Sequence, residues 1–213
     1  MTEVYAISGS IIQDKMENID ELAEALNSGE EQKVVVTGAG SLSRYQQKVD
    51  GNKGEKDLIG IKATRLHAQT LLTEMDDCHP SVPETPEELK EAASTGKNVV
   101  TGGLVPGYST DAVAATVAEL LEADLYIATH VDGIYSGDPE EDDDVEKYDE
   151  ITTEELLELT GGKNEPGTYS VVDESAIRLI ERSSIRTRVF YADNQNIVDP
   201  DRAEGTEIRA TDK

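Results

Sequence analysis

Three glycine-bearing segments carry residue types that suit phosphate binding. They are ISGS (7–10), TGAGSLSR (37–44) and TGGLVPGYST (101–110), and each follows a short β-branched run. Glycine lets the backbone approach a phosphate closely, and a helix that begins after such a turn presents unpaired N–H groups. One turn of this kind is more often a tight connection than a binding site. Three in matching positions favour a phosphate site.

The third segment raises the question of what neutralises a bound anion. TGGLVPGYSTDAVAA (101–115) contains no lysine or arginine, and Asp111 is its only charged residue. Backbone N–H groups at the start of the following helix are therefore its expected donors. Arg44, after the second turn, offers a fixed fork of donors that suits transferring phosphoryl oxygens. An exposed surface arginine is the alternative interpretation.

The standard nucleotide-binding motifs do not fit these turns. GxxxxGK[ST] is absent, and TGAGSLSR lacks the GxGxxG spacing with an acidic residue about 20 positions on. His67, His79 and His130 are too scattered to form a convincing metal triad, and the consecutive carboxylates of 137–150 are not spaced to converge on one ion. We therefore expect another phosphate-handling α/β family, with no metal ligand from protein side chains.

The elements that must position the turns are short strands separated by helical patterns. This alternation predicts an α/β fold with a mainly parallel central sheet between two layers of helices, and the turns then gather at the carboxyl edge of the strands. Capping boxes are expected at Thr85 with Glu88 and at Thr152 with Glu155. The predicted strands are 4–8, 33–37, 98–101, 125–129 and 187–191, and the predicted helices are 18–28, 57–75, 86–94, 110–121, 153–160 and 173–182.

The composition restricts the class of protein and its compartment. With 45 acidic and 19 basic residues among 213, the formal charge is -26, which argues against a general binder of nucleic acid or anionic membranes. We interpret the acidic excess as a solvated, halophilic surface. Cys78 is the single cysteine, so no intramolecular disulfide forms, and with no targeting or membrane segment a cytoplasmic location is expected. The acidic segment 137–150 is interpreted as a hydrated connection.

Five ordered segments carry a resemblance to a known family. TGAGSLSRY resembles the turn GGGxxxR, DLIGIKATRLHA (57–68) resembles a helix with D-x-IGI-x-x-(T/S)R-x-N-A, and TGGLVPGYSTDAVAA resembles GG-x-x-PG-x-(S/T)T-x-AVAA. ATHVDGIYSGDP (128–139) is similar to AT-N-VDGVY-x-x-DP, and GTYSVVDESAIRLIERSSIRT (167–187) to a GTY-x-x-x-D stretch that ends in IRT. From about Val4 to Tyr191 the chain thus resembles the archaeal uridylate (UMP) kinases of the amino-acid kinase superfamily.

The resemblance implies a fold and an activity. The fold is the three-layer amino-acid kinase (carbamate kinase-like) fold, as one domain over 1–213 with an acceptor-binding lobe at about 1–123 and an ATP-binding lobe at about 124–213. The activity is reversible transfer of the ATP γ-phosphoryl group to UMP, giving UDP and ADP, in pyrimidine nucleotide (CTP) biosynthesis. Mg²⁺ enters with ATP. A homohexamer built as a trimer of dimers and feedback inhibition by UTP are also implied.

The resemblance assigns site residues position by position, with Arg44 as the catalytic residue. Those implied to face UMP are Ala39, Asp57, Leu104, Val105, Pro106, Gly107, Tyr108, Ser109 and Thr110. Those implied to face ATP are Gly9, Ser10, Gly40, Arg44, Thr129, His130, Tyr135 and Asp138.

This chain departs from the family pattern at four places. Ala6 stands where many members have a lysine, Ala39 replaces the middle glycine of GGG, and His67 and His130 replace asparagines. The methyl group of Ala39 would intrude if the turn required a positive φ at that residue. These departures leave two alternatives open, namely an enzyme of the same fold with another acceptor, and a non-catalytic nucleotide-binding or storage protein.

Overall fold

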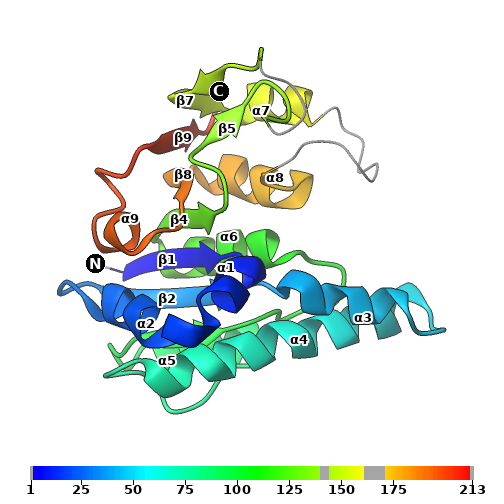
Figure 1. Cartoon of the computed structure of the whole chain (residues 1–213), viewed down its shortest axis with the longest axis vertical. Coiled ribbons are helices and arrows are strands. Elements are labelled where there is room, and N and C mark those ends of the chain that lie inside the picture. The colour runs from blue at the N-terminus through cyan, green and yellow to red at the C-terminus, as the bar shows by residue number, and fades with distance from the viewer. Residues whose placement is uncertain (1, 140–143, 161–170, 212–213) are drawn as a thin grey trace.

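A large central sheet runs through the described part of the molecule, and helices pack on both of its faces (Figure 1). The computed structural model describes residues 2–139, 144–160 and 171–211. Within these residues the sheet has seven strands. In spatial order they are β3 (Val99–Thr101), β2 (Gln32–Thr37), β1 (Thr2–Ile7), β4 (Asp124–Thr129), β8 (Thr187–Tyr191), β9 (Gly205–Arg209) and β7 (Glu150–Thr152).

The five strands predicted from the sequence are the parallel part of this sheet. Strands β3, β2, β1, β4 and β8 run in one direction, so their carboxyl ends share an edge. β9 pairs antiparallel with β8 and parallel with β7. A separate antiparallel hairpin joins β5 (Ile134–Tyr135) to β6 (Lys147–Tyr148). The mainly parallel α/β sheet is confirmed.

Alternate residues of the strands supply two hydrophobic cores, one on each face. On β1, Val4 and Ala6 enter one core, and Tyr5 and Ile7 enter the other. Each buried aliphatic side chain stabilises the fold by about 1.5–3 kcal/mol relative to leaving it in water. The first core is covered by α5 (Pro86–Ala93), α6 (Thr110–Leu121), α7 (Thr153–Leu159) and α8 (Glu174–Ser183), and the second by α1 (Gly9–Asp14), α2 (Ile19–Asn27), α4 (Lys53–Glu74) and α9 (Asn194–Val198).

The predicted helices are present, but α4 begins four residues earlier than expected. Asn52 caps it, because its side-chain oxygen accepts from the Glu55 N–H at 3.0 Å while the Glu55 carboxylate accepts from the Asn52 N–H at 2.8 Å. Five short helices of the described residues were not predicted, namely α1, η1 (Met16–Asn18), η2 (Gly40–Ser43), α3 (Arg44–Gln47) and α9. A helix of fewer than two turns leaves too little hydrophobic periodicity to be recognised.

Two further expectations need correction. The capping box at Thr152 and Glu155 is confirmed, but Glu88 accepts from the N–H of Glu84 at 2.8 Å, so Thr85 makes only the forward half of its box. The segment 137–150 is more than a connection, because it contains β6 and the first residue of β7. Residues 140–143 of that segment lie outside the described part. None of the described helices is long and apolar enough to span a membrane.

Candidate functional site

The first two glycine turns pack backbone against backbone at the carboxyl edge of the sheet. Gly9 opens α1 directly after β1, and a Cβ placed on it would lie 2.2 Å from the Gly40 nitrogen and 2.4 Å from the Gly38 oxygen. Gly38 N–H donates to the carbonyl oxygen of Ile7 at 2.9 Å. Glycine at position 9 is therefore required by the contact between the turns, before any ligand is considered.

Ala39 fits the second turn without backbone strain. Its φ is -85° and its ψ is -22°, which is ordinary right-handed geometry, whereas the following Gly40 has φ +54°. The left-handed conformation that favours glycine thus falls on residue 40. Alanine at position 39 is compatible with this backbone.

The third turn uses two of its glycines to lie against helix α4. A Cβ on Gly102 would meet the Thr64 hydroxyl at 2.4 Å, and one on Gly103 would meet Ile61 at 2.9 Å. The Gly103 N–H donates to that hydroxyl at 2.7 Å. We expected these glycines to admit a ligand, but they serve the packing of the turn on α4.

The tip of the third turn is tied to the beginning of α4 and to the start of α6. Gly107 has φ +86°, and its N–H donates to the Asp57 carboxylate at 2.9 Å. Ser109 caps α6 by accepting from the Ala112 N–H at 3.0 Å, and its hydroxyl donates to Asp173. Asp173 in turn caps α8 by accepting from the N–H groups of residues 175 and 176. The N-termini of two helices therefore converge beside this turn.

Two cavities open at these turns and meet at shared residues. The first, the donor cavity, has about 210 Å³ and is lined by Ser8, Gly9, Gly38, Ala39, Gly40, Thr110, Asp111, Thr129 and neighbouring residues. The second, the acceptor cavity, has about 290 Å³ and is lined by Ala39, Ser43, Gln46, Asp57, Gly60, Ile61, Thr64, Gly103, Val105, Tyr108, Ser109 and Thr110. Ala39 and Thr110 belong to both. Two ligands bound side by side would meet there.

Neither cavity is lined by a lysine or arginine from the described residues. Each has one carboxylate, Asp111 in the donor cavity and Asp57 in the acceptor cavity. Burial, and then the nearby charge of Asp173, raises the pKa of Asp111 to about 7. The donor cavity thus disfavours added negative charge unless a cation accompanies it.

Arg44 lies next to the acceptor cavity without lining it. It begins α3, between Ser43 and Gln46, which do line that cavity. Its side chain is exposed, and within the described part of the chain it makes no hydrogen bond or ion pair. The guanidinium is therefore not committed to another partner.

Residues expected to face ATP divide into two groups. Gly9, Gly40 and Thr129 line the donor cavity, and Ser10 lies beside it, where its hydroxyl is 2.7 Å from the His130 Nε2 atom. Tyr135 and Asp138 lie further along the chain, on β5 and in the connection from β5 to β6, and line neither cavity.

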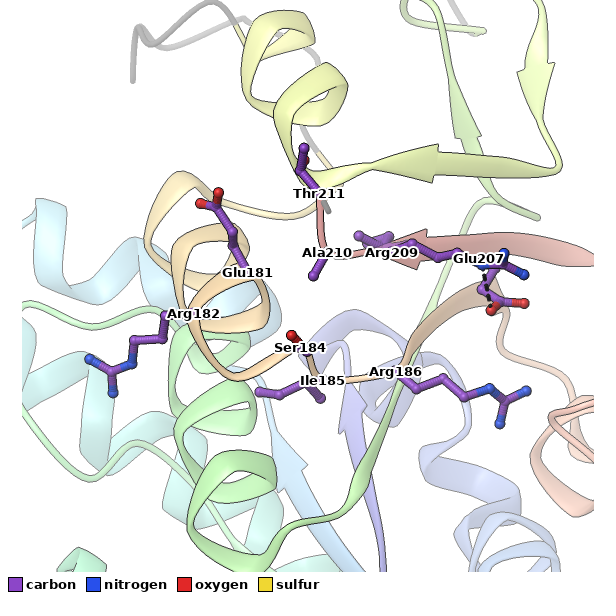
Figure 2. Close-up of a pocket in the computed structure, with 10 residues that line it drawn as sticks. Glu181, Arg182, Ser184, Ile185, Arg186, Glu207, Arg209, Ala210 and Thr211 are labelled. Carbon is purple, nitrogen blue, oxygen red and sulfur yellow. Dashed lines mark hydrogen bonds and ion pairs between the residues drawn. The ribbon is translucent and has the colours of Figure 1, made fainter. Parts of the chain in front are cut away.

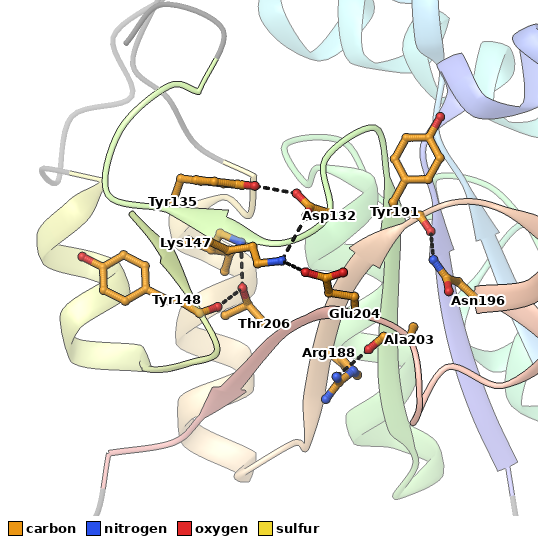
Figure 3. A network of polar contacts seen from close by, with 11 residues as sticks. Asp132, Tyr135, Lys147, Tyr148, Arg188, Tyr191, Asn196, Ala203, Glu204 and Thr206 are labelled. Carbon is orange, nitrogen blue, oxygen red and sulfur yellow. Dashed lines mark hydrogen bonds and ion pairs between the residues drawn. The ribbon is translucent and has the colours of Figure 1, made fainter. Parts of the chain in front are cut away.

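A polar network holds the β5–β6 hairpin (Figure 3). The Tyr135 hydroxyl donates to Asp132 at 2.7 Å, and the Lys147 ammonium donates to the other oxygen of Asp132 at 3.0 Å. Lys147 also pairs with Glu204, the residue directly before β9. Tyr135 is thereby held in one orientation by a carboxylate that is itself fixed.

The residues expected to face UMP are also divided. Ala39, Asp57, Val105, Tyr108, Ser109 and Thr110 line the acceptor cavity. Leu104 is buried and lines a third, apolar cavity, which shares Val105 and Tyr108 with the acceptor cavity. Pro106 and Gly107 line neither site cavity. The prediction missed Ser8, Gly38, Ser43, Gln46, Thr64 and Asp111. All of these except Gln46 were inside quoted motifs, but only the fold shows that they face a cavity.

A cavity larger than either the donor or the acceptor cavity, about 390 Å³, lies elsewhere (Figure 2). It is bounded by the end of α8, the start of β8 and the end of β9, which is the edge opposite the glycine turns. Its arginines are engaged, Arg182 with Glu119, Arg186 with Asp124 and Asp201, and Arg209 with Glu150 and Glu207. Nothing there resembles a phosphate site. The described residues also contain no group of three or more His, Cys, Asp or Glu that could hold a metal ion.

Known proteins resemble this chain over almost its whole length. Residues 1–191 match the model of the amino acid kinase family. The uridylate kinase of Archaeoglobus fulgidus is 37% identical over 206 residues, covering 93% of this chain and 94% of that protein, and the uridylate kinase of Methanothermobacter thermautotrophicus is 41% identical over 210 residues, with the same coverage.

Solved structures agree with this likeness. The crystal structure of the Archaeoglobus fulgidus uridylate kinase superposes with a TM-score of 0.88 at 36% identity, over 98% of this chain and 100% of that one. The UMP kinase of Ureaplasma parvum superposes with a TM-score of 0.79 over 98% of each chain, but at 21% identity it supports the fold alone.

Proposed function

Because the chain belongs to the amino acid kinase family, we propose that it is a UMP kinase, which transfers the γ-phosphoryl group of ATP to UMP and gives UDP and ADP. The observation that carries the proposal is the junction of the donor and acceptor cavities at Ala39 and Thr110. Phosphoryl transfer between two nucleotides requires two adjoining sites with the reacting atoms roughly in line. The reaction runs in both directions and serves pyrimidine nucleotide (CTP) synthesis.

UMP occupies the acceptor cavity. The Asp57 carboxylate, near the start of α4, accepts hydrogen bonds from the sugar hydroxyls, and the N-terminus of α6 faces the phosphate through Ser109 and Thr110. Asp57 already fixes the third turn through Gly107, so the same group positions the loop and the sugar. The residues assigned to UMP are Ala39, Asp57, Leu104, Val105, Pro106, Gly107, Tyr108, Ser109 and Thr110.

ATP places its phosphates over the first two turns in the donor cavity. Gly9 and Gly40 have no side chain, so their backbone lies close to the phosphates. Thr129, the last residue of β4, lines the same cavity on the side of the adenosine. Tyr135, held by Asp132, and Asp138 lie on the side of the adenosine. The residues assigned to ATP are Gly9, Ser10, Gly40, Arg44, Thr129, His130, Tyr135 and Asp138.

The chemistry needs no covalent intermediate on the enzyme. A 5′-phosphate oxygen of UMP attacks the γ-phosphorus of ATP, the bond from that phosphorus to the bridging oxygen breaks, and ADP leaves. Arg44 provides charge-assisted hydrogen bonds to the transferring phosphoryl oxygens. Helix N-termini and backbone N–H groups hold the phosphates in place.

The donor cavity fits a magnesium ion that enters with ATP. Asp111 is a carboxylate of this cavity, where burial and then the nearby charge of Asp173 raise its pKa, so a bound cation would stabilise its charged form. Asp111 is therefore the residue of this chain that would hold the ion. Bound magnesium offsets the negative charge of the nucleotide phosphates.

The remaining features of the proposal concern the organisation of the protein. The chain acts as one domain, with acceptor-binding and ATP-binding lobes that meet near residue 123. It works in the cytoplasm as a homohexamer built from dimers, and UTP inhibits it. Because the -26 charge repels itself at low ionic strength, the assembly loosens as salt is removed. Sedimentation from low to multimolar salt measures this.

An acceptor panel tests the function. Purified protein with Mg-ATP in multimolar salt is expected to phosphorylate UMP well ahead of CMP, AMP, acetylglutamate and carbamate. Preference for another acceptor would assign the fold a different substrate. Absence of turnover in low and multimolar salt, with UMP bound tightly by calorimetry, would support a storage or binding protein. One reason for considering a non-catalytic protein was the strain that Ala39 would cause if the second turn required a positive φ there, and its φ of -85° removes that reason.

A further inference from the structure

Helix α4 contains a buried histidine that the proposed chemistry does not use. His67 is only 2% exposed, although an imidazole ring has two polar nitrogens. Its Nδ1 atom lies 2.7 Å from the carbonyl oxygen of Gly38. Its Nε2 atom lies 3.5 Å from the Nε2 atom of Gln13, on α1. Burying an imidazole is costly unless its nitrogens are hydrogen-bonded, so the contacts of His67 with the second turn and with α1 indicate a structural role.

Gln13 continues this chain of contacts to the far end of the second turn. Its Oε1 atom accepts from the Ser41 backbone N–H at 3.0 Å. A backbone N–H can only donate, so the carbonyl oxygen of Gln13 must face it and the amide nitrogen must face His67. The amide nitrogen also only donates, so the His67 Nε2 atom accepts. The ring then donates from Nδ1 to the Gly38 carbonyl oxygen, so both ring nitrogens have a matched partner.

The segment held by these contacts, residues 38–41, is the wall between the two cavities. Gly38, Ala39 and Gly40 line the donor cavity, and Ala39 also lines the acceptor cavity. The segment continues directly from β2, and the Gly38 N–H bond to Ile7 ties it to β1. His67 fixes the carbonyl of the same residue, and Gln13 fixes the segment at Ser41. Neither side chain lines a cavity, so both act at a distance from the ligands.

We propose that His67 and Gln13 are positioning residues that together hold the segment 38–41 in the geometry required for phosphoryl transfer. This inference rests on the proposed function. It means that Gln13 on α1 and His67 on α4 support the wall between the two cavities. Small displacements of groups that orient reacting atoms cost activity steeply. Loss of either contact therefore lowers turnover and ATP affinity while the fold persists.

Kinetics and calorimetry of three variants test the proposal. His67→Phe fills the site but loses both hydrogen bonds, and Gln13→Met loses the bonds to Ser41 and His67. For each we expect kcat to fall and the KM and Kd for ATP to rise, each by about tenfold, with the Kd for UMP within about twofold of wild type. His67→Asn places an amide nitrogen near the former Nδ1 position and keeps the bond to Gly38. It is expected to recover most of the ATP affinity.

A double variant tests whether the two residues act as one unit. His67→Phe combined with Gln13→Met is expected to resemble His67→Phe alone, because both changes release the same segment. Gln69→Met, at an exposed position of α4, is the matched control and is expected to behave like wild type. The proposal is overturned if the fold-changes of the two single variants multiply in the double variant. It is also overturned if each variant loses activity only in proportion to its loss of folded protein.

The outcomes separate this inference from the proposed function. If the wild-type protein is active and the variants bind ATP normally, the positioning role of His67 and Gln13 is refuted, while the proposed function stands. Wild-type protein that does not phosphorylate UMP would refute the proposed function, while the ATP affinities of the variants still decide the inference. If His67→Phe fails to fold, His67→Asn and Gln13→Met give the answer.

Discussion

Asp111 links the candidate site to the pH dependence of stability. It is the second residue of α6 and lines the donor cavity, where burial first and the charge of Asp173 second raise its pKa from 3.8 to about 7. The folded protein therefore holds this proton more tightly than the unfolded chain. Stability is greatest when the group is protonated and falls as the pH rises between about 4 and 7.

The size of the effect follows from the two pKa values. A rise from 3.8 to about 7 corresponds to about 4 kcal/mol in total, of which about 2.5 kcal/mol falls between pH 5 and pH 8. Asp111 keeps some contact with solvent, which reduces the figure. Asparagine at this position does not titrate. We expect Asp111→Asn to gain about 1 to 2.5 kcal/mol more stability at pH 8 than at pH 5, relative to wild type.

Urea unfolding at constant, high ionic strength measures this difference without added nucleotide or magnesium. Asp20→Asn is the matched control, because Asp20 is also the second residue of a helix, α2, but is exposed. Its effect on the free energy of unfolding is expected to be the same at both pH values. An Asp111→Asn effect that does not change between pH 5 and pH 8, or that Asp20→Asn reproduces, would refute the reasoning.

Three further substitutions probe the two cavities. Arg44→Ala is expected to lower kcat by about 100-fold or more while the Kd for UMP stays within about twofold, because the guanidinium acts on the transferring group; stopped-flow kinetics and calorimetry measure the two. Asp57→Ala removes the acceptor for the sugar hydroxyls and for the Gly107 N–H, so the Kd for UMP is expected to rise by about tenfold or more with the KM for ATP unchanged. Gly9→Ala is expected to abolish ATP binding and to lower the melting temperature, because its Cβ would lie 2.2 Å from the Gly40 nitrogen.

Each of these substitutions has a control in the same chain. Lys48→Ala, exposed one turn after Arg44, is expected to leave kcat unchanged. Glu55→Ala removes a carboxylate close to Asp57 but outside the acceptor cavity, so only stability is expected to fall. Gly54→Ala lies in the exposed first turn of α4, where a Cβ meets nothing closer than 3.4 Å. Equal effects of a substitution and its control would contradict the assigned role.

The parallel part of the fold could be predicted from the sequence because its strands are continuous β-branched runs. Val34, Val35 and Val36 of β2, for example, are buried on both faces of the sheet, which favours a continuous apolar run. β9, GTEIR, and β6, KY, are short and carry charged residues, so their sequences have no such pattern. β9 forms by pairing with β8, and β6 forms by pairing with β5. Such pairing depends on residues outside the strand itself, so the local sequence does not predict it.

The site could be located from the sequence, but the role of its glycines could not. Motif positions placed Asp57, Thr110 and Thr129 at the edge where the structure has its cavities. Gly9 and Gly102 were expected to admit a ligand, whereas each allows another backbone or helix to approach. The burial of Asp111 and its proximity to Asp173 depend on how α6 and α8 meet, which is a property of the assembled fold.

A crystal structure with UMP and a non-hydrolysable ATP analogue tests the central claim most directly. The account predicts UMP in the acceptor cavity, with its sugar hydroxyls on Asp57 and its phosphate at Ala39 and Thr110. The triphosphate is predicted over Gly9 and Gly40, with its γ-phosphorus facing the UMP phosphate. Nucleotides bound elsewhere, or phosphates separated by protein, would contradict the claim that the two cavities form one transfer site.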